Sequence, residues 1–444
     1  MRLYDVKPIL EQFAKNLSLC SLCLVCLSMS IDYSWAQAVK VEVAGKNGKY
    51  QLLRDGKPYR VNGAGFDYSD MEILALRGGN SIRTWATDVD GDDTLKLLDE
   101  AHKLGITVSL CLYTGSERHG FDYYDEEAVA EQLASIRKEV LRYKDHPALL
   151  SWFIGNELNF DYKNPRVWDA VNDISLMIHE LDPNHPTTTT IAGLNENLLE
   201  MISTRAPDLD FLSFQLYGQL YDLPRFVKST KFKAPYFITE WGAIGHWEVP
   251  KTKWGAPLEQ TSSEKADTYL RGYDKVIKPY TGQVIGNYVF LWGQKQEKTP
   301  TWYGLFAETG EETEVIDVLQ YIWTGTWPEN RAPRLQSISL NGKSAHDNVR
   351  LDAGKTYTAE VFVKDSDGDP ITYLWQVKNE SNATQVGGDY EEMIPSLPGL
   401  ISDPAAQSIE LAAPLNPGAY RLFVYAYDGH GHAAHANIPF YVGE

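Results

Sequence analysis

Short β-rich segments recur eight times between residues 58 and 293, and a helical or turn-rich stretch separates each one from the next. Several of these segments are almost continuously apolar, which is typical of strands in a parallel sheet that helices cover. This repeated order restricts the chain to an α/β fold with a parallel sheet. The expected strands are residues 59–66, 81–86, 106–113, 149–157, 187–193, 211–218, 235–242 and 284–293.

The stretches between the strands have the spacing of amphipathic helices. Residues 92–105 place leucines on one side and end at Gly105, and residues 125–147 form a longer helix that Pro147 closes. Eight such units in about 240 residues match the size of a TIM barrel. A doubly wound sheet is the alternative, but no glycine-rich phosphate turn follows the first strand. We therefore predict a (β/α)8 TIM barrel over residues 39–328.

The pattern changes after residue 328. Prolines and asparagine break the helical pattern, so residues 329–334 are predicted to be a linker, and alternating apolar and polar runs over residues 335–444 indicate a smaller all-β, Ig-like sandwich. The segment DSDGDPITYLW is similar to polycystic-kidney-disease and cadherin-like sandwiches. Its turn at 365–370 could be a calcium loop, but Gln376 stands where an EF-hand has its twelfth ligand. We interpret it as a tight inter-strand turn.

The N-terminus has the layout of a secretory signal peptide. Basic residues precede an apolar stretch at 17–31, and the small-x-small sequence WAQA ends at Ala38. The apolar stretch is too short for a membrane span. We therefore predict a signal peptide over residues 1–38, a secreted or periplasmic location, and no membrane insertion after its removal. Cys111 is the one cysteine left after that, and its apolar surroundings predict a buried side chain.

The charge of the chain excludes some partners. A formal net charge of −19 argues against nucleic acid as a ligand, since phosphate binding needs a basic surface. A content of 12 Trp and 26 Tyr suits carbohydrate binding, where rings stack on sugars. His102 and His119 lack partners at metal-ligand spacing. We expect a polysaccharide or oligosaccharide substrate, and neither a cofactor nor a metal.

Polar and aromatic residues stand where several predicted strands end. In a barrel of this kind these ends open onto the binding face. Burying unpaired carboxylates costs several kcal/mol, so two that converge there need a reason, and glycoside hydrolysis by a pair of carboxyls supplies one. The residues at the strand ends are Arg83, Asn156, Glu157, Tyr217, Glu240 and Trp292.

At this point the sequence resembles glycoside hydrolase clan A, the retaining TIM-barrel glycosidases. WFIGNEL looks like the acid/base motif of the clan, and YFITEWG looks like its nucleophile motif. The resemblance implies that Glu157 is the general acid/base and Glu240 the nucleophile. It also implies that Arg83 in IRTWA holds Glu240 ionised and that Asn156 meets the sugar 2-hydroxyl.

Further roles follow from the same resemblance. Tyr217 would hydrogen-bond the nucleophile, and Trp292 would floor the sugar subsite. Many clan members have His or Asn two residues before this tyrosine, where SFQLYG has Gln215. Tryptophans near the predicted mouth offer rings for sugar C–H faces, and we include Trp85 and Trp241 among the substrate-binding residues. The tryptophans of this group are Trp85, Trp152, Trp241, Trp247, Trp254 and Trp302.

The expected activity is retaining hydrolysis of a β-glycoside, with the two carboxyls about 5 to 5.5 Å apart. The segments LLRDGKPYRVNGAGFD and IRTWATDVDGDDTLKLLDEAHKLGI look most like family 2-type catalytic barrels and β-1,3-glucan-active families, so a β-1,3-linked glucan is the expected substrate. A transglycosylase with the same residues and a non-catalytic carbohydrate-binding barrel are the alternatives. The loops at 114–124, 158–166 and 243–262 are expected to decide the sugar and the linkage.

Overall fold

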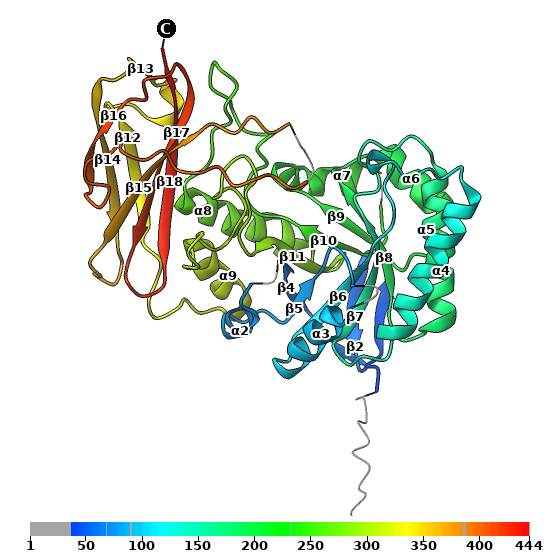
Figure 1. Cartoon of the computed structure of the whole chain (residues 1–444). Coiled ribbons are helices and arrows are strands. Elements are labelled where there is room, and N and C mark those ends of the chain that lie inside the picture. Colours follow the sequence, from blue (N-terminus) through cyan, green and yellow to red (C-terminus); the bar gives the residue numbers. More distant parts are fainter. Residues whose placement is uncertain (1–36, 68, 89–90, 231, 385–387, 444) are drawn as a thin grey trace, which may run out of the picture. The chain divides into compact units, whose positions relative to one another are not determined.

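The computed structural model of the chain describes residues 37–67, 69–88, 91–230, 232–384 and 388–443 (Figure 1). Nearly all of the predicted signal peptide therefore lies outside the described residues. Residues 38–444 form one compact unit. Within the described part of the chain, no helix has the length and apolar character that crossing a bilayer requires.

Parallel strands close into a barrel in which each strand pairs with the next along the chain and the last pairs with the first. Each strand lies inside one of the predicted segments, so the (β/α)8 prediction is confirmed. The strands are β4 (Val61–Phe66), β5 (Ser81–Arg83), β6 (Thr107–Leu112), β7 (Leu149–Asn156), β8 (Thr187–Ala192), β9 (Leu212–Gln215), β10 (Tyr236–Glu240) and β11 (Val284–Trp292).

The longer helices pack around the barrel, and α4, α6 and α8 begin at side chains that cap them. The Asp125 carboxylate accepts from two backbone N–H groups at the start of α4, and Thr261 and Glu264 form a capping box at α8. The helices are α2 (Met71–Leu76), α3 (Asp93–Lys103), α4 (Glu126–Tyr143), α5 (Arg166–Leu181), α6 (Glu196–Arg205), α7 (Leu223–Thr230), α8 (Ser262–Gly272) and α9 (Glu314–Thr324).

A small antiparallel sheet that was not predicted precedes the barrel. It comprises β1 (Val41–Lys46), β2 (Lys49–Arg54) and β3 (Lys57–Pro58). Val41 and Leu52 share a buried core with Phe237 and Cys111 of the barrel, which places Cys111 as predicted. Backbone hydrogen bonds join this sheet to the turns just before β8 and β11. The sheet therefore closes the N-terminal end of the barrel and leaves the other end open.

The C-terminal region folds into two facing sheets with an apolar core between them. One sheet contains β12 (Arg334–Leu340), β14 (Thr356–Lys364) and β16 (Ser408–Ala412). The other contains β13 (Arg350–Leu351), β15 (Thr372–Asn379), β17 (Gly418–Tyr427) and β18 (Ala433–Val442). The turn at 365–370 is organised by the Asp365 Oδ1 atom, which accepts from three backbone N–H groups.

A buried polar network joins the barrel to the sandwich. The carboxylate of Glu259, before α8, accepts from Lys265 Nζ at 2.5 Å and from Asn437 Nδ2 of β18 at 2.6 Å. Arg421 of β17 donates to Asn437 Oδ1 at 2.7 Å and to the carbonyl of Pro257 at 2.9 Å. Burial would raise the pKa of Glu259, but the Lys265 ammonium and the hydrogen bonds lower it to about 2. The network therefore holds an ionised carboxylate between the two regions.

We expect Lys265→Met to lower the free energy of unfolding by about 3–5 kcal/mol, because it leaves the Glu259 charge buried without its counter-ion. Urea unfolding at neutral pH measures the loss. Lys96→Met is the matched control, since Lys96 pairs with Asp93 while its side chain is 73% exposed, and its loss should stay below about 1 kcal/mol. Equal losses in both variants would contradict the structural role of the network.

Candidate active site

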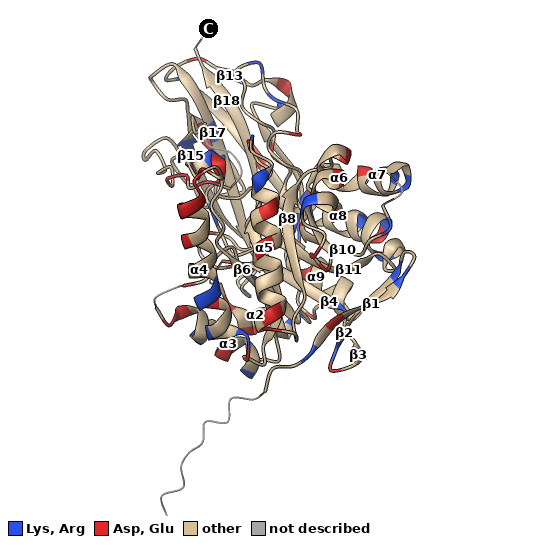
Figure 2. Ribbon diagram, turned by 90° about the vertical axis from the view of Figure 1, so that its right-hand side faces the viewer, with Lys and Arg blue, Asp and Glu red and all other residues tan. Residues whose placement is uncertain are grey.

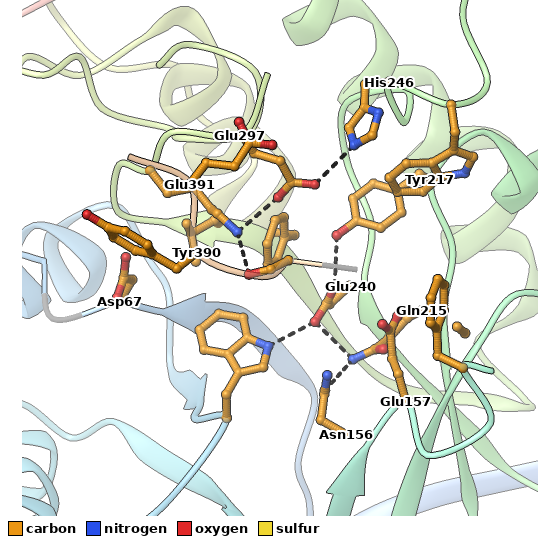
Figure 3. A pocket seen from close by; sticks show the side chains of 18 of the residues that line it. Asp67, Asn156, Glu157, Gln215, Tyr217, Glu240, His246, Glu297, Tyr390 and Glu391 are labelled. Atoms are coloured by element: carbon orange, nitrogen blue, oxygen red, sulfur yellow. Dashed lines mark hydrogen bonds and ion pairs between the residues drawn. The ribbon is translucent and has the colours of Figure 1, made fainter. Parts of the chain in front are cut away.

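A cavity of about 1010 Å³ opens at the C-terminal ends of the barrel strands. Both predicted carboxylates, Glu157 after β7 and Glu240 at the end of β10, line it and are labelled in Figure 3. Asn156, Tyr217 and Trp85 line the same cavity. The barrel thus brings together residues that are up to 155 positions apart in the sequence, as the carboxyl ends of parallel strands do.

Glu240 is surrounded by hydrogen-bond donors and is only 5% exposed. Its Oε1 atom accepts from Gln215 Nε2 at 2.9 Å, from Trp85 Nε1 at 3.0 Å and from Arg83 Nη1 at 3.2 Å. Its Oε2 atom accepts from the Tyr217 hydroxyl at 2.7 Å. An Arg ion pair and three further donors stabilise the ionised carboxylate. Oε2 accepts from one donor and Oε1 accepts from three, so Oε2 keeps more lone-pair density free to face a ligand.

Asn156 is held by its side-chain oxygen. The Oδ1 atom accepts from Arg83 Nη2 at 2.7 Å, from Gln215 Nε2 at 2.8 Å and from Thr190 Oγ1 at 3.2 Å. Donors on one side of an amide fix which end is oxygen, so the Nδ2 group is left to donate. It donates to none of the described residues, and the side chain lines the cavity. Gln215 thus takes a defined place in the site, where the sequence left its contact open.

Glu157 has very different surroundings from Glu240. Its backbone lies in the left-handed region, at φ 50°, directly after β7, and its N–H bonds to the carbonyl of Thr190 at 3.2 Å. No described residue donates a hydrogen bond to its carboxyl group. Burial and the nearby Glu240 charge raise the pKa of Glu157 to about 8, against a smaller opposing effect of Arg83 and Arg118. Glu157 is therefore protonated at neutral pH.

Arg83 and Trp85 support the nucleophile side of the site. The Arg83 side chain is fully buried, and its guanidinium lies 4.9 Å from the centre of the Trp85 ring. Arg83 does not line the cavity. It donates hydrogen bonds to Glu240 and Asn156, which do line it, and so positions those two side chains.

Trp241 and Trp292 are not in the cavity, contrary to the prediction. Trp241 follows Glu240 directly, so its side chain points to the other face of the strand, where it packs on Tyr269 and donates to Asn287. Trp292 packs against Trp323 of α9 and donates to the carbonyl of Asp70. Both tryptophans are fully buried core residues.

A local irregularity explains the position of Trp292. The pairing of β11 with β4 shifts in register between Val289 and Trp292. Such a shift moves a side chain to the opposite face of the sheet, and sequence alternation does not reveal it. Phe290 and Leu291 line the cavity in its place. Of the six tryptophans expected near the mouth, Trp85 and Trp247 line it.

The remaining lining residues come from loops, and the sequence singled out only some of these loops. Residues 294–297 after β11 contribute Lys295 and Glu297, which form an ion pair at 2.9 Å. Two of the loops expected to shape specificity, 158–166 and 243–262, contribute residues 159–161 and 246–248. Residues 388, 390, 391 and 393 belong to the C-terminal region, and no signal in the sequence linked them to a barrel mouth.

One group of carboxylates among the described residues could hold a metal ion. Oxygens of Asp365, Asp369 and Asp428 lie within 4.8 Å of one another in the sandwich, outside the cavity lining. Asp365 organises the turn at 365–370, and Asp428 bonds to His432 Nδ1 at 2.7 Å. These partners account for the positions of the carboxylates, and we assign the group no catalytic part.

Fold and site together define a (β/α)8 barrel protein with two carboxyls in one cavity, one surrounded by hydrogen-bond donors and one whose pKa is raised by burial. No protein-family model matches the chain. A segment of 128 residues is 29% identical to mannan endo-1,4-beta-mannosidase F of Aspergillus clavatus, and it covers 26% of this chain and 29% of that protein.

Solved structures with a similar fold include Bacteroides uniformis beta-glucuronidase 2 covalently bound to cyclophellitol-6-carboxylate aziridine, at 14% identity and a TM-score of 0.48. That match covers 91% of this chain and 48% of the glucuronidase. A glycoside hydrolase family 5 mannosidase from Rhizomucor miehei is 13% identical with a TM-score of 0.47, and the match covers 64% of this chain and 96% of the mannosidase. This chain thus spans about half the length of the glucuronidase and under a third of the length of mannosidase F.

Proposed function

We propose that this protein is a retaining β-glycoside hydrolase that acts on a polysaccharide or oligosaccharide. The observation that carries the proposal is the contrast between two carboxyls in one cavity. Four hydrogen-bond donors surround the Glu240 carboxyl group, whereas burial and the nearby Glu240 raise the pKa of Glu157 to about 8. Glycoside cleavage by double displacement needs one carboxyl of each kind.

In the first step, Glu240 Oε2 attacks the anomeric carbon while Glu157 gives its proton to the leaving oxygen. The bond between that carbon and the leaving sugar breaks, and a glycosyl ester forms on Glu240. In this proposal Asn156 Nδ2, which donates to none of the described residues, donates to the sugar 2-hydroxyl. Forming the ester removes the negative charge of Glu240, so the Coulombic cause of the raised Glu157 pKa disappears after Glu157 has lost its proton.

In the second step, an incoming water attacks the anomeric carbon while the ionised Glu157 takes a proton from it. The ester bond breaks and Glu240 is released as a carboxylate. Two inversions give net retention. A sugar hydroxyl in place of water would give transglycosylation with the same residues.

For the substrate we propose a β-linked glucan, with a β-1,3 linkage from the resemblance noted in the sequence. A β-1,4-mannan is the second candidate, because the curated relative carries that substrate in its name. The N-terminal sequence also supports a proposal that the protein is secreted or periplasmic, where such polymers are encountered.

The test is a screen of the purified protein on β-glucans, β-mannans and β-galactans, with sizing of products. NMR of the first product formed determines the anomer: a β-anomer from a β-substrate supports retention, and an α-anomer would refute it. Products longer than the substrate would identify a transglycosylase. Binding without any cleavage would favour a non-catalytic carbohydrate-binding barrel.

A further inference from the structure

One wall of the active-site cavity comes from the sandwich. The connection between β15 and β16 runs from Glu380 to Gln407, and its residues 388, 390, 391 and 393 line the cavity with the barrel residues. Figure 3 shows Tyr390 and Glu391 facing the same space as Glu240. We call residues 388–393 the sandwich wall. A module that only tethered the enzyme to a polymer would not need to reach the catalytic carboxyls.

Two barrel loops hold the sandwich wall in place. Asp389 forms an ion pair with Arg118 at 3.2 Å and contacts His119 Nε2 at 3.4 Å, in the loop after β6. In the loop after β11, the Lys298 N–H donates to Glu391 Oε2 at 3.0 Å, and Lys295 Nζ donates to the carbonyl of Gly388 at 3.2 Å.

The ends of the β15–β16 connection are also anchored. At its start, Glu380 accepts from Arg421 at 2.6 and 3.0 Å, and Arg421 itself donates to a barrel carbonyl. Towards its end, the Leu397 N–H donates to the carbonyl of Val377 at 2.7 Å. Fixed ends and ion pairs in the middle give the sandwich wall a defined position, which a binding surface requires.

The sandwich wall presents an exposed aromatic ring to the cavity. The Tyr390 residue is 83% exposed although it lines the cavity, and Asp67 of the barrel lines the same cavity (Figure 3). Trp247, after β10, is another lining aromatic that stays 51% exposed. An exposed ring inside a concave site gains free energy when an apolar face covers it. The C–H face of a pyranose supplies such a face, and its hydroxyl rim can donate to a carboxylate such as Asp67.

On the basis of the proposed function, we propose that the sandwich supplies a sugar-binding subsite of the enzyme, in which Tyr390 stacks on a sugar unit away from the bond that is cleaved. The substrate class that follows is a β-linked chain of several sugars. A glycoside with one sugar and a small aglycone fills the catalytic position and does not reach Tyr390.

The test compares Tyr390→Ala with the unchanged protein on an aryl β-monoglycoside and on β-linked oligosaccharides of two to six sugars. We expect kcat/KM to fall about tenfold on the hexasaccharide, through a higher KM, and to change by no more than about twofold on the aryl glycoside. Tyr390→Phe keeps the ring and should keep the activity. Tyr124→Ala is the control, because Tyr124 is 66% exposed and outside the cavity lining.

Equal losses on all substrates, or no loss on the hexasaccharide, would overturn the subsite. If the unchanged protein cleaves nothing, the proposed function fails, and the subsite is then tested by binding. Calorimetric titration with laminarihexaose, cellohexaose and mannohexaose should show about tenfold weaker binding to Tyr390→Ala. Equal affinity, or no binding to either protein, would overturn the subsite independently of catalysis.

Discussion

Glu240→Gln is expected to lower kcat on the polysaccharide on the order of 10⁴-fold or more, because an amide cannot form the glycosyl ester. The amide is isosteric with the carboxylate and keeps one oxygen for the donors at Oε1. Arg83 loses its charged partner, so part of the stability is lost as well. Initial rates measured well below the melting temperature of the variant separate the two effects.

Asp161→Asn is the matched control for that substitution. Asp161 also lines the cavity, and its φ of 54° is one that asparagine accepts. The change removes one negative charge from the same cavity and from a loop expected to contact the sugar, so KM can change, whereas kcat should stay within about threefold of the original. A comparable loss in both variants would mean that overall charge, and not a nucleophile, drives the reaction.

The covalent step can be observed directly. A β-glycoside with fluorine at C2 and an acidic phenol as leaving group should add one glycosyl unit to the protein, because the fluorine slows both formation and loss of the ester, whereas the acidic phenol speeds only its formation. Peptide mass spectrometry should find the sugar on Glu240. A label on Glu157 would reverse the two assigned roles, and the absence of any label on an active enzyme would contradict the ester.

The sequence predicts the part of the site that topology determines. Arg83, Asn156, Glu157, Tyr217 and Glu240 stand at or just after the ends of four strands, and a closed parallel barrel carries all such ends to one face. Knowing the strands was therefore sufficient to expect these residues at a common mouth. The hydrogen bonds around Glu240 depend on side-chain geometry that the order of residues alone does not give.

The remainder of the site depends on contacts that leave no local pattern. Trp292 is displaced by a register shift inside β11, and Trp241 takes the opposite face from its neighbour Glu240. Tyr390 lies 150 positions beyond Glu240, in a connection of a different domain type. A loop between two sandwich strands has the same turn composition whether it meets solvent or an active site. The packing of the sandwich on the barrel decides which it meets.

Glu157→Gln is expected to separate the two steps of the reaction. On the polysaccharide, whose leaving group needs a proton, kcat should fall by about 10²- to 10⁴-fold. An aryl glycoside with an acidic phenol still forms the ester but is then deglycosylated slowly. Azide, which attacks without a general base, should restore turnover and give a β-glycosyl azide. An α-azide, or no effect of azide, would contradict the role of Glu157.

The same substitution should remove the alkaline limb of the pH profile and stabilise the fold. Burial raises the pKa of Glu157 from 4.5 to about 8, so the folded protein holds this proton more tightly than the unfolded chain. The wild-type protein therefore loses stability as the pH rises between these values, and it loses activity above about pH 8 as the acid ionises.

Glutamine does not ionise, so the stability difference between Glu157→Gln and the wild-type protein should be nearly absent below pH 4.5 and should reach about 4 kcal/mol in favour of the variant near pH 8. Urea unfolding of both proteins across this range measures it. A variant that is less stable than the wild-type protein at pH 8 would show that ionisation of Glu157 does not destabilise the folded protein. The environment that keeps the catalytic acid protonated therefore lowers the free energy of unfolding at alkaline pH, and the variant should regain that free energy.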